Sequence, residues 1–308
     1  MQPKDVNNLK ANIYATLAYF DIFDYPLTIE EVGKYLLWAN AERNELWTFL
    51  NNDPFIQRYG DFYFFKGRRP IVDLRREREK VAEKFWKKAR KFVPLIQFVP
   101  FVRMVAVCNT LAMNNPTAES DIDLFIVAKS GRLFLARTLV TFLMGVLGVR
   151  RHGSKVAGRF CLSFYVTDDS LNLEGVKKDA DDIYLPFWLH TLKPVYGVET
   201  WEKLLIENQW IRKYFPRTVE KVEFWPERRI LKWSAAVKEK IWNGKMGNRV
   251  EAWLADKQYK RYQRNLKKFG SEASVIVSEK MLKFHNLDRR REFSEKFRQR
   301  FEEVMAMS

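Results

Sequence analysis

Residues 105–127 of the chain read VAVCNTLAMNNPTAESDIDLFIV. The segment begins within an apolar, β-branched run that extends from Val102 to Val107. It ends with a second apolar run, from Leu124 to Val127. Directly before the second run stand Asp121 and Asp123, which a single apolar residue separates. Because side chains alternate along a strand, both carboxylates are expected on one face, roughly 7 Å apart, with the isoleucine between them turned into the core.

Two carboxylates at this distance can share divalent cations. Mg²⁺ takes one or two protein carboxylates and completes its shell with water and substrate phosphates, so Asp121 and Asp123 suit metal-assisted phosphoryl transfer with Mg²⁺ or Mn²⁺. Upstream, Cys108 leads through Asn109 and Thr110 into an expected short helix, whose backbone N–H groups and hydroxyl can bind phosphate. An Asp-X-Asp alone is common as two solvated acids; the upstream turn, the spacing and the strand context favour the metal site.

The surrounding pattern predicts an α/β (α+β) domain. A third strand is expected from Phe160 to Val166, and an amphipathic helix from about Arg132 to Leu147 precedes it. We divide the chain into four parts: 1–70, a winged helix-turn-helix; 71–100, a basic linker helix; 101–190, the domain with the carboxylate pair; and 191–308, a basic and mostly helical region.

The first 70 residues have the order of a winged helix-turn-helix. Helices are expected from Ile13 to Phe20, from about Thr28, which opens a capping box with Glu31, and from about Glu42 to Asn51. Two short aromatic-rich runs on either side of Gly60-Asp61 predict a hairpin. The third helix is not basic, so this part is either a weak nucleic-acid binder or a protein-docking module.

Charge is distributed unevenly along the 308 residues, whose formal net charge is +16. Residues 1–70 carry 8 basic and 9 acidic side chains, residues 71–103 carry 10 and 4, residues 104–190 carry 9 and 9, and residues 191–308 carry 27 and 16. Positive charge therefore flanks a neutral middle, which suits a protein that holds a polyanion against a central site. The plainer alternative is that Lys and Arg solvate helix faces.

Several classes of protein are disfavoured by the composition. No apolar run reaches the ~20 residues of a membrane span, and Met1 to Lys10 lack the apolar segment of a secretory signal, so we expect a cytoplasmic protein with no membrane partner. Cys108 and Cys161 both stand in apolar runs, which indicates two buried thiols rather than a disulfide or a metal site. The three histidines are too scattered for a zinc motif.

The stretch from Val105 to Val127 resembles the DNA polymerase β-type nucleotidyltransferase superfamily, whose motif is an apolar strand, Gly, then Gly or Ser, a spacer of about ten residues and Asp-apolar-Asp-apolar. Most of the chain also resembles, with less specific motifs, uncharacterised bacterial nucleotidyltransferase-like proteins with an N-terminal winged helix. The resemblance implies that Asp121 and Asp123 hold Mg²⁺ or Mn²⁺ against a nucleoside triphosphate, and that Asn109 and Thr110 bind its phosphates.

The sequence departs from that motif in two ways. Asn109 stands where the family has its first Gly, and Asn tolerates a positive φ better than most residues. The family's third carboxylate lies on a later strand, whereas Phe160 to Val166 contains no acid and is followed by Asp168 and Asp169. Either the third acid is lost, or one of these two replaces it from the strand end.

Cations that could hold the triphosphate follow the carboxylate strand. Lys129, Arg132 and Arg137 could act as a clamp or could solvate the helix surface; we keep Arg137 as the nucleotide-binding candidate and expect surface roles for the other two.

Three functions remain open from the sequence. The leading hypothesis is a metal-dependent enzyme that moves a nucleoside monophosphate from a nucleoside triphosphate to an acceptor hydroxyl, with RNA or DNA as the acceptor that the basic flanks favour. The second is a catalytically inactive relative that binds nucleic acid or regulates. The third is a transcription regulator with a nucleotide-sensing domain.

Overall fold

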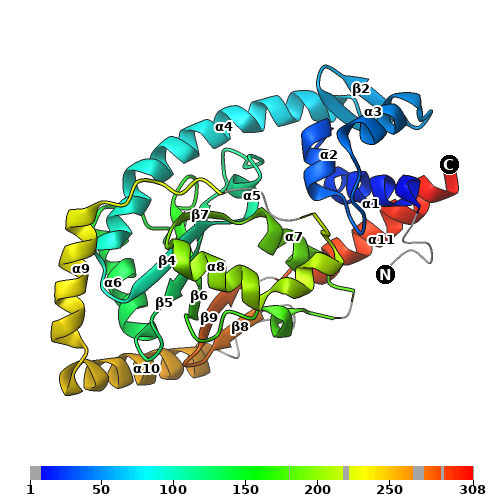
Figure 1. Cartoon of the computed structure of the whole chain (residues 1–308). Helices are drawn as coiled ribbons and strands as arrows, with labels where there is room; N and C mark the ends of the chain where they lie inside the picture. Colours follow the sequence, from blue (N-terminus) through cyan, green and yellow to red (C-terminus); the bar gives the residue numbers. More distant parts are fainter. Residues whose placement is uncertain (1–7, 180, 218–221, 266–273, 286–287, 308) are drawn as a thin grey trace.

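A computed structural model of the chain describes residues 8–179, 181–217, 222–265, 274–285 and 288–307. The protein contains a six-stranded mixed sheet in the order β7-β4-β5-β6-β9-β8 and a three-stranded sheet in the order β1-β3-β2 (Figure 1). The mixed α and β class predicted from the sequence is therefore confirmed. In the part of the chain that the structure describes, no helix combines the length and the apolarity that crossing a bilayer requires.

Three helices and the small antiparallel sheet form the N-terminal elements. Their bounds are α1 (Leu9–Asp21), β1 (Leu27–Thr28), α2 (Ile29–Tyr35), α3 (Arg43–Asn52), β2 (Ile56–Tyr59) and β3 (Phe62–Phe65). The predicted capping box is present, because the Glu31 backbone N–H donates to the Thr28 hydroxyl at 3.3 Å and the Thr28 N–H donates to the Glu31 carboxylate at 2.9 Å. The predicted hairpin is present too, with Gly60 in its turn at φ 61°.

A long helix connects these elements to the larger sheet. Helix α4 (Pro70–Phe92) continues into the 3₁₀ helix η1 (Val93–Phe98). The linker helix expected over 71–100 begins at Pro70, because proline at the first helical position needs no backbone donor. Near its start, the buried Arg75 donates to Glu31 at 2.6 Å and 2.9 Å, which fixes the helix against the N-terminal elements.

The three strands and the helix predicted around the carboxylate pair are all present. They are β4 (Val102–Val107), α5 (Asn109–Ala112), β5 (Ile122–Ala128), α6 (Leu133–Val146) and β6 (Phe160–Thr167). Strands β5 and β6 run parallel, with α6 as the connection between them, whereas β4 pairs antiparallel with β5. The first residues of β5 and β6 therefore meet at the same edge of the sheet.

Three further strands lie within residues 191–308, which were expected to be mostly helical. They are β7 (Lys193–Tyr196), β8 (Ser274–Val277) and β9 (Met281–His285). Strand β7 pairs with β4, and β9 pairs with β6 and β8. Each is four or five residues long. Strands β7 and β9 pair with strands from distant parts of the chain, and β8 joins the sheet through β9, so local periodicity does not reveal them.

The other regular elements of the described chain are helices. They are η2 (Glu174–Val176), α7 (Tyr184–Thr191), α8 (Val198–Glu207), η3 (Gln209–Lys213), α9 (Arg229–Trp242), α10 (Lys245–Asn265) and α11 (Arg290–Met307). The two faces of the large sheet have separate cores. Leu124 and Ile126 pack in the same cluster as α6, whereas Phe125 and Val127 pack with α7, α8 and η3. Alternate residues of β5 thus face opposite layers of helices.

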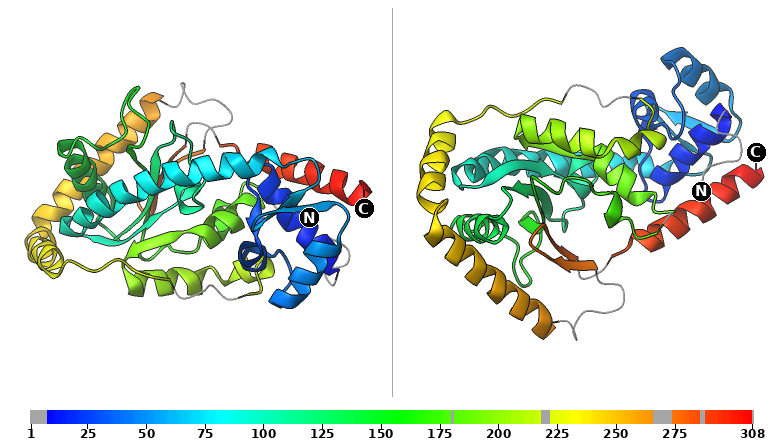
Figure 2. Two further views of the ribbon diagram at one scale, coloured as in Figure 1. Left: turned by 90° about the horizontal axis from the view of Figure 1, so that it is seen from above. Right: turned by 60° about the horizontal axis from the view of Figure 1, so that its bottom comes forward.

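The C-terminal helix α11 packs against the N-terminal elements, beside α1 (Figures 1 and 2). Its Phe297, Phe301 and Val304 are buried in the same core as the residues of α1 and α2. Arg300 of α11 donates to Asp21 of α1 at 2.7 Å. The core of the N-terminal elements is therefore built from both ends of the chain.

Candidate functional site

The carboxylate pair predicted from the sequence lies at the start of β5. Asp121 and Asp123 are both half-buried, and Ile122 between them is fully buried, as the alternation of side chains requires. A carboxylate oxygen of each aspartate and the Sγ atom of Cys161 all lie within 4.8 Å of one another. Three atoms that can bind a cation are thus gathered at one edge of the sheet.

Cys161 occupies the position next to Asp123 on the neighbouring strand. The two residues are direct partners in the parallel pairing of β5 with β6. Both cysteines are buried and unpaired, as the sequence predicted, and Cys161 lies close enough to Asp121 and Asp123 to belong to a group that could hold a metal ion. Burial raises the pKa of the Cys161 thiol, and the charges of Asp123 and Asp121 raise it further.

Asp168 and Asp169 lie at the other end of the two strands. The Ser130 backbone N–H donates to Asp168 at 2.8 Å, and the Ser130 hydroxyl donates to Asp169 at 2.7 Å. Ser130 lies two residues after the end of β5, whereas Asp121 directly precedes its first residue, and a strand of this length separates them by roughly 20 Å. Neither acid can therefore replace the third carboxylate that the resemblance implies, and the residue beside the pair is Cys161.

The electrostatic setting of Asp123 is unfavourable to its charge. Burial raises the pKa of Asp123 to about 6, and the neighbouring charge of Asp121 adds to the increase, while a hydrogen bond from Asn109 opposes it. A carboxyl group whose pKa is raised by burial and by a like charge is typical of functional sites.

Arg151 is a member of the site that the sequence analysis missed. Its guanidinium donates to Asp121 at 2.6 Å and lies 3.8 Å from the Sγ atom of Cys161. The backbone N–H of Arg151 donates to the Phe160 carbonyl oxygen at 2.9 Å, which holds the loop before β6 against the start of that strand. Nothing in the local sequence distinguishes Arg151 from Arg150, because only the pairing of this loop with β6 selects it.

Asn109 and Thr110 follow β4 in the turn that was expected to bind phosphate. Asn109 adopts φ 56°, the left-handed conformation foreseen for this position, and its side chain hydrogen-bonds to Asp123. Thr110 is exposed on the short helix α5. The Cys108 N–H donates to the Asp123 carbonyl oxygen at 3.1 Å, so the turn and the carboxylate pair are held together by the backbone.

The structure does not bring Arg137 to the carboxylate pair. Asp123 lies on the same face of β5 as Phe125 and Val127, whereas α6, which carries Arg137, covers the opposite face. The guanidinium of Arg137 donates to Gln258 at 3.1 Å and lies 4.6 Å from the centre of the Phe284 ring. Its contacts tie α6 to α10 and β9.

Lys129 and Arg132 have structural contacts of the same kind. The Lys129 amine donates to Asn243 at 3.2 Å, and Arg132 donates to Asn248 at 2.6 Å. Both residues follow the last residue of β5, at the same end of the strand as Asp168. They fasten the turn between α9 and α10 to the sheet.

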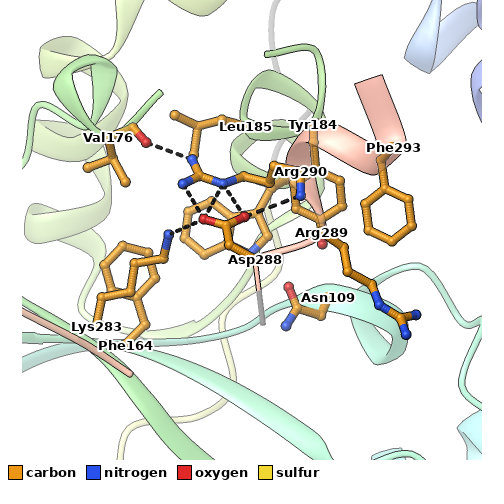
Figure 3. Close-up of a pocket in the computed structure, with 11 residues that line it drawn as sticks. Asn109, Phe164, Val176, Tyr184, Leu185, Lys283, Asp288, Arg289, Arg290 and Phe293 are labelled. Atoms are coloured by element: carbon orange, nitrogen blue, oxygen red, sulfur yellow. Dashed lines mark hydrogen bonds and ion pairs between the residues drawn. The ribbon is translucent and has the colours of Figure 1, made fainter. Parts of the chain in front are cut away.

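A cavity of about 200 Å³ lies near the carboxylate pair and has Asn109 in its wall; Figure 3 shows the residues that line it. Because Asn109 also hydrogen-bonds to Asp123, this one residue links the cavity to the pair. Aromatic and aliphatic side chains line most of the remainder: Phe164, Val176, Tyr184, Leu185, Trp188 and Phe293. Lys283, Asp288, Arg289 and Arg290 add charge to one side of it.

The charged residues of the cavity form a buried network. Asp288 lies between the guanidinium of Arg290, at 2.6 Å, and the amine of Lys283, at 3.6 Å (Figure 3). Arg290 also reaches Asp182 at 3.1 Å. Burial lowers the pKa of the Lys283 amine to about 8, and Arg290 adds to the decrease, while Asp288 opposes it. Arg289 lies on the same side of the cavity as Asn109, away from this network (Figure 3).

Comparisons with known proteins identify no relative of this chain. A search with family models finds no match, and searches of curated proteins and of solved structures find none either. The functional argument therefore rests on the geometry of the site.

Proposed function

We propose that the protein is a metal-dependent nucleotidyltransferase, built on a nucleotidyltransferase-type sheet and preceded by a winged helix. The observation that carries the proposal is the group of Asp121, Asp123 and Cys161, whose ligand atoms lie within 4.8 Å of one another near a cavity with aromatic walls and cations. In the reaction, an acceptor hydroxyl oxygen forms a bond to the α-phosphorus of a nucleoside triphosphate, and the bond to pyrophosphate breaks.

The residues at the pair fit a hard divalent cation. Asp121 and Asp123 supply the carboxylate oxygens that Mg²⁺ and Mn²⁺ prefer. Two protein ligands leave the other coordination positions of the metal to phosphate oxygens and water. Bound there, the metal would neutralise charge on the phosphates and polarise them. The raised pKa of Asp123 agrees with this role, because a cation would relieve the repulsion from Asp121 that contributes to it.

The cavity suits the nucleoside part of the substrate. Tyr184 and Phe293 stack with 5.4 Å between ring centres, and Trp188 lies nearby in the wall, so flat apolar surfaces are available to a base. Arg289 lies on the side of Asn109 and can reach a phosphate chain that leaves the cavity toward the pair. In this arrangement Asn109 and Thr110 bind phosphate oxygens, and Arg137 keeps its contacts with α10.

The side chain at position 161 limits the rate of the proposed nucleotidyl transfer. A third carboxylate at this position would accept the proton of the attacking hydroxyl, and a thiol with a raised pKa stays protonated at neutral pH and cannot accept it. Positioning and charge stabilisation then supply the acceleration without an optimal base. We therefore expect slow transfer.

Nucleic acid is the acceptor that the charge favours. Residues 191–308 carry 27 basic and 16 acidic side chains, and phosphate contacts with Lys and Arg dominate nucleic-acid affinity. The winged helix adds little positive charge for nucleic-acid binding, because Arg43 at the start of α3 is paired with Glu30 at 3.0 Å. Its exposed Trp47 suits docking against a protein.

The direct test is label transfer from each α-³²P nucleoside triphosphate, with Mg²⁺ or Mn²⁺, to RNA, DNA or the protein itself. Asp121→Ala is expected to abolish transfer while the chain stays folded, because it removes a metal ligand from a half-buried position. Glu119→Ala is the matched control, since this exposed carboxylate two residues upstream should leave transfer intact. Transfer that persists in Asp121→Ala would overturn the assignment.

A second candidate function is supported by the same residues. The thiol at position 161 and the ion pair between Arg151 and Asp121 suit a nucleotidyltransferase-like module that has lost catalysis and binds nucleic acid. Such a module would bind RNA or DNA with an affinity that falls steeply with salt and is indifferent to Mg²⁺ and to Asp121→Ala. Binding that requires the metal would count against it.

A further inference from the structure

Helix α9 carries a stripe of exposed apolar side chains. Ile230 is 81% exposed, Trp233 70%, Val237 39% and Ile241 65%. Their spacing of three, four and four residues places them on one face of the helix. Single exposed apolar residues are common on protein surfaces, but four along one helical face, three of them β-branched and one a tryptophan, make that face unusually apolar. We call these four residues the α9 stripe.

The opposite face of α9 is fixed to the body of the protein. Ala235 is buried, and the helix packs against η1. Glu239 accepts hydrogen bonds from the Phe101 backbone N–H at 2.6 Å and from the Arg103 guanidinium at 2.8 Å and 3.0 Å. These contacts determine the rotation of the helix about its axis. The α9 stripe therefore faces outward, at the edge of the molecule farthest from α11 (Figures 1 and 2).

Cations border the α9 stripe, and the acid of the helix points away from it. On a helical projection Arg229 and Lys240 lie along one border of the stripe, and both are exposed. Glu239, the acidic residue within α9, is committed to Arg103 on the inward face. The outward face of the helix is thus apolar at its centre and positive along one border.

We propose that the α9 stripe binds the surface of an anionic lipid bilayer, with α9 lying in the plane of the interface. An apolar face with Trp and aliphatic residues, bordered by Lys and Arg, is the pattern of helices that lie at the boundary between head groups and acyl chains. Tryptophan is enriched at this depth because its ring is apolar and its N–H is polar. The proposal concerns attachment to one leaflet, so it departs from the sequence expectation of no membrane partner, which rested on the lack of a spanning segment.

Charge and apolar contact argue against two other partners for the α9 stripe, a second copy of the chain and nucleic acid. A second copy of the chain would bring the same positive border against this one, and like charges there disfavour that pairing. Nucleic acid would satisfy the cations and could stack on Trp233, but it offers no apolar surface to cover Ile230 and Ile241. An anionic bilayer satisfies both the apolar centre and the positive border. The α9 stripe shares no residue with the carboxylate pair, so the two proposals stand independently.

The test is sedimentation of the full chain with vesicles. Binding to vesicles of phosphatidylcholine mixed with phosphatidylglycerol is expected, with much weaker binding to pure phosphatidylcholine. The double variant Ile230→Ser/Trp233→Ser should weaken binding at least about tenfold, which corresponds to 1.4 kcal/mol. Both residues are exposed, so the variant should keep the circular dichroism spectrum and melting temperature of the wild type.

The matched control is Trp47→Ser, which removes a half-exposed tryptophan from α3 and should leave vesicle binding unchanged. Failure of the wild type to bind anionic vesicles, or equal binding by the double variant, would overturn the proposal. So would a dimer, seen in solution without lipid, that the double variant abolishes, because the α9 stripe would then belong to a second copy. Loss of RNA or DNA binding in the double variant, with no effect on vesicles, would overturn it in favour of nucleic acid.

Discussion

The carboxylate of Asp123 lies beside that of Asp121, accepts a hydrogen bond from Asn109 and is partly shielded from water. Burial is the larger cause of its raised pKa, and the charge of Asp121 is the next. The folded chain thus holds a charge at neutral pH that the unfolded chain would hold at less cost. A bound cation would remove this penalty, which links the electrostatics of one residue to the proposed function.

The first prediction concerns the stability of Asp123→Asn at different pH values in the absence of metal. The pKa of Asp123 rises from its usual 3.8 to about 6 on folding, so the protonated form is favoured in the fold and the penalty grows as pH rises from about 4 to above 6. Removing the charge should stabilise the protein by about 2 kcal/mol at pH 8 and by little at pH 4. Urea unfolding at both pH values, with chelator present, measures the difference.

Glu119→Gln provides the control for that measurement, because Glu119 is exposed and its replacement should change stability little at either pH. A variant Asp123→Asn that is less stable than the wild type at pH 8 would contradict the electrostatic account.

Local sequence was enough to predict part of the site. The Asp-Ile-Asp pattern placed Asp121 and Asp123 on one face of a strand, and the preference of Asn for positive φ foresaw the turn at Asn109. Cys161 and Arg151 could not be predicted, because their positions depend on the register between β5 and β6, two strands that a helical crossover separates. The same register places Asp168, which the sequence offered as a replacement for the third carboxylate, at the opposite end of these two strands.

The second prediction follows from the position of Cys161 as the direct strand partner of Asp123. Cys161→Asp would place a third carboxylate beside the pair and supply a proton acceptor, so nucleotidyl transfer should rise at least about tenfold. Cys161→Asn is the matched control, because it has a similar size and no charge, and it should not raise the rate. Single-turnover transfer at saturating Mg²⁺ measures the effect. An unchanged or lower rate in a folded Cys161→Asp would show that this position does not limit proton transfer.

At the scale of elements, the close contact between α8 and β4 depends on one glycine. Gly197 precedes α8 with φ 93°, and a Cβ atom there would lie 2.2 Å from the Arg103 carbonyl oxygen. Gly197→Ala should therefore destabilise the protein by roughly 3 kcal/mol or more, through both the backbone conformation and the clash. Gly175→Ala is the control, since nothing lies within 4 Å of a Cβ there, and it should change stability by less than about 0.5 kcal/mol. Thermal unfolding compares the two, and equal stability of both variants would contradict the contact.

Elements with their own periodicity or turn chemistry were predictable, and elements that depend on a distant partner were not. Strands β4, β5 and β6 and the hairpin of β2 and β3 follow from apolar runs and a Gly-Asp turn. Strands β8 and β9 extend the sheet from a segment more than a hundred residues after β6, and their short, mixed sequence has no strong alternation. The pairing itself makes them strands.

At the scale of the whole molecule, the two ends of the chain share one core. Phe297 of α11 is 4% exposed, lies 6.2 Å from the Tyr19 ring and stacks on Phe301. Phe297→Ala should destabilise the protein by about 3 kcal/mol, because it leaves a cavity between α11 and the N-terminal elements. Glu302→Ala on the exposed side of α11 should have little effect. Urea unfolding followed by circular dichroism compares them, and a Phe297→Ala as stable as the wild type would contradict a shared core.

The most direct test of the central claim is the position of a bound metal. A crystal of the protein with Mn²⁺ and a non-hydrolysable nucleoside triphosphate should show an anomalous difference peak at coordination distance from the carboxylates of Asp121 and Asp123, with the base in the cavity beside Tyr184. The peak should disappear in Asp121→Ala. A structure with the nucleotide bound elsewhere, or with Mn²⁺ absent from the pair at saturating concentration, would contradict the assignment of this site.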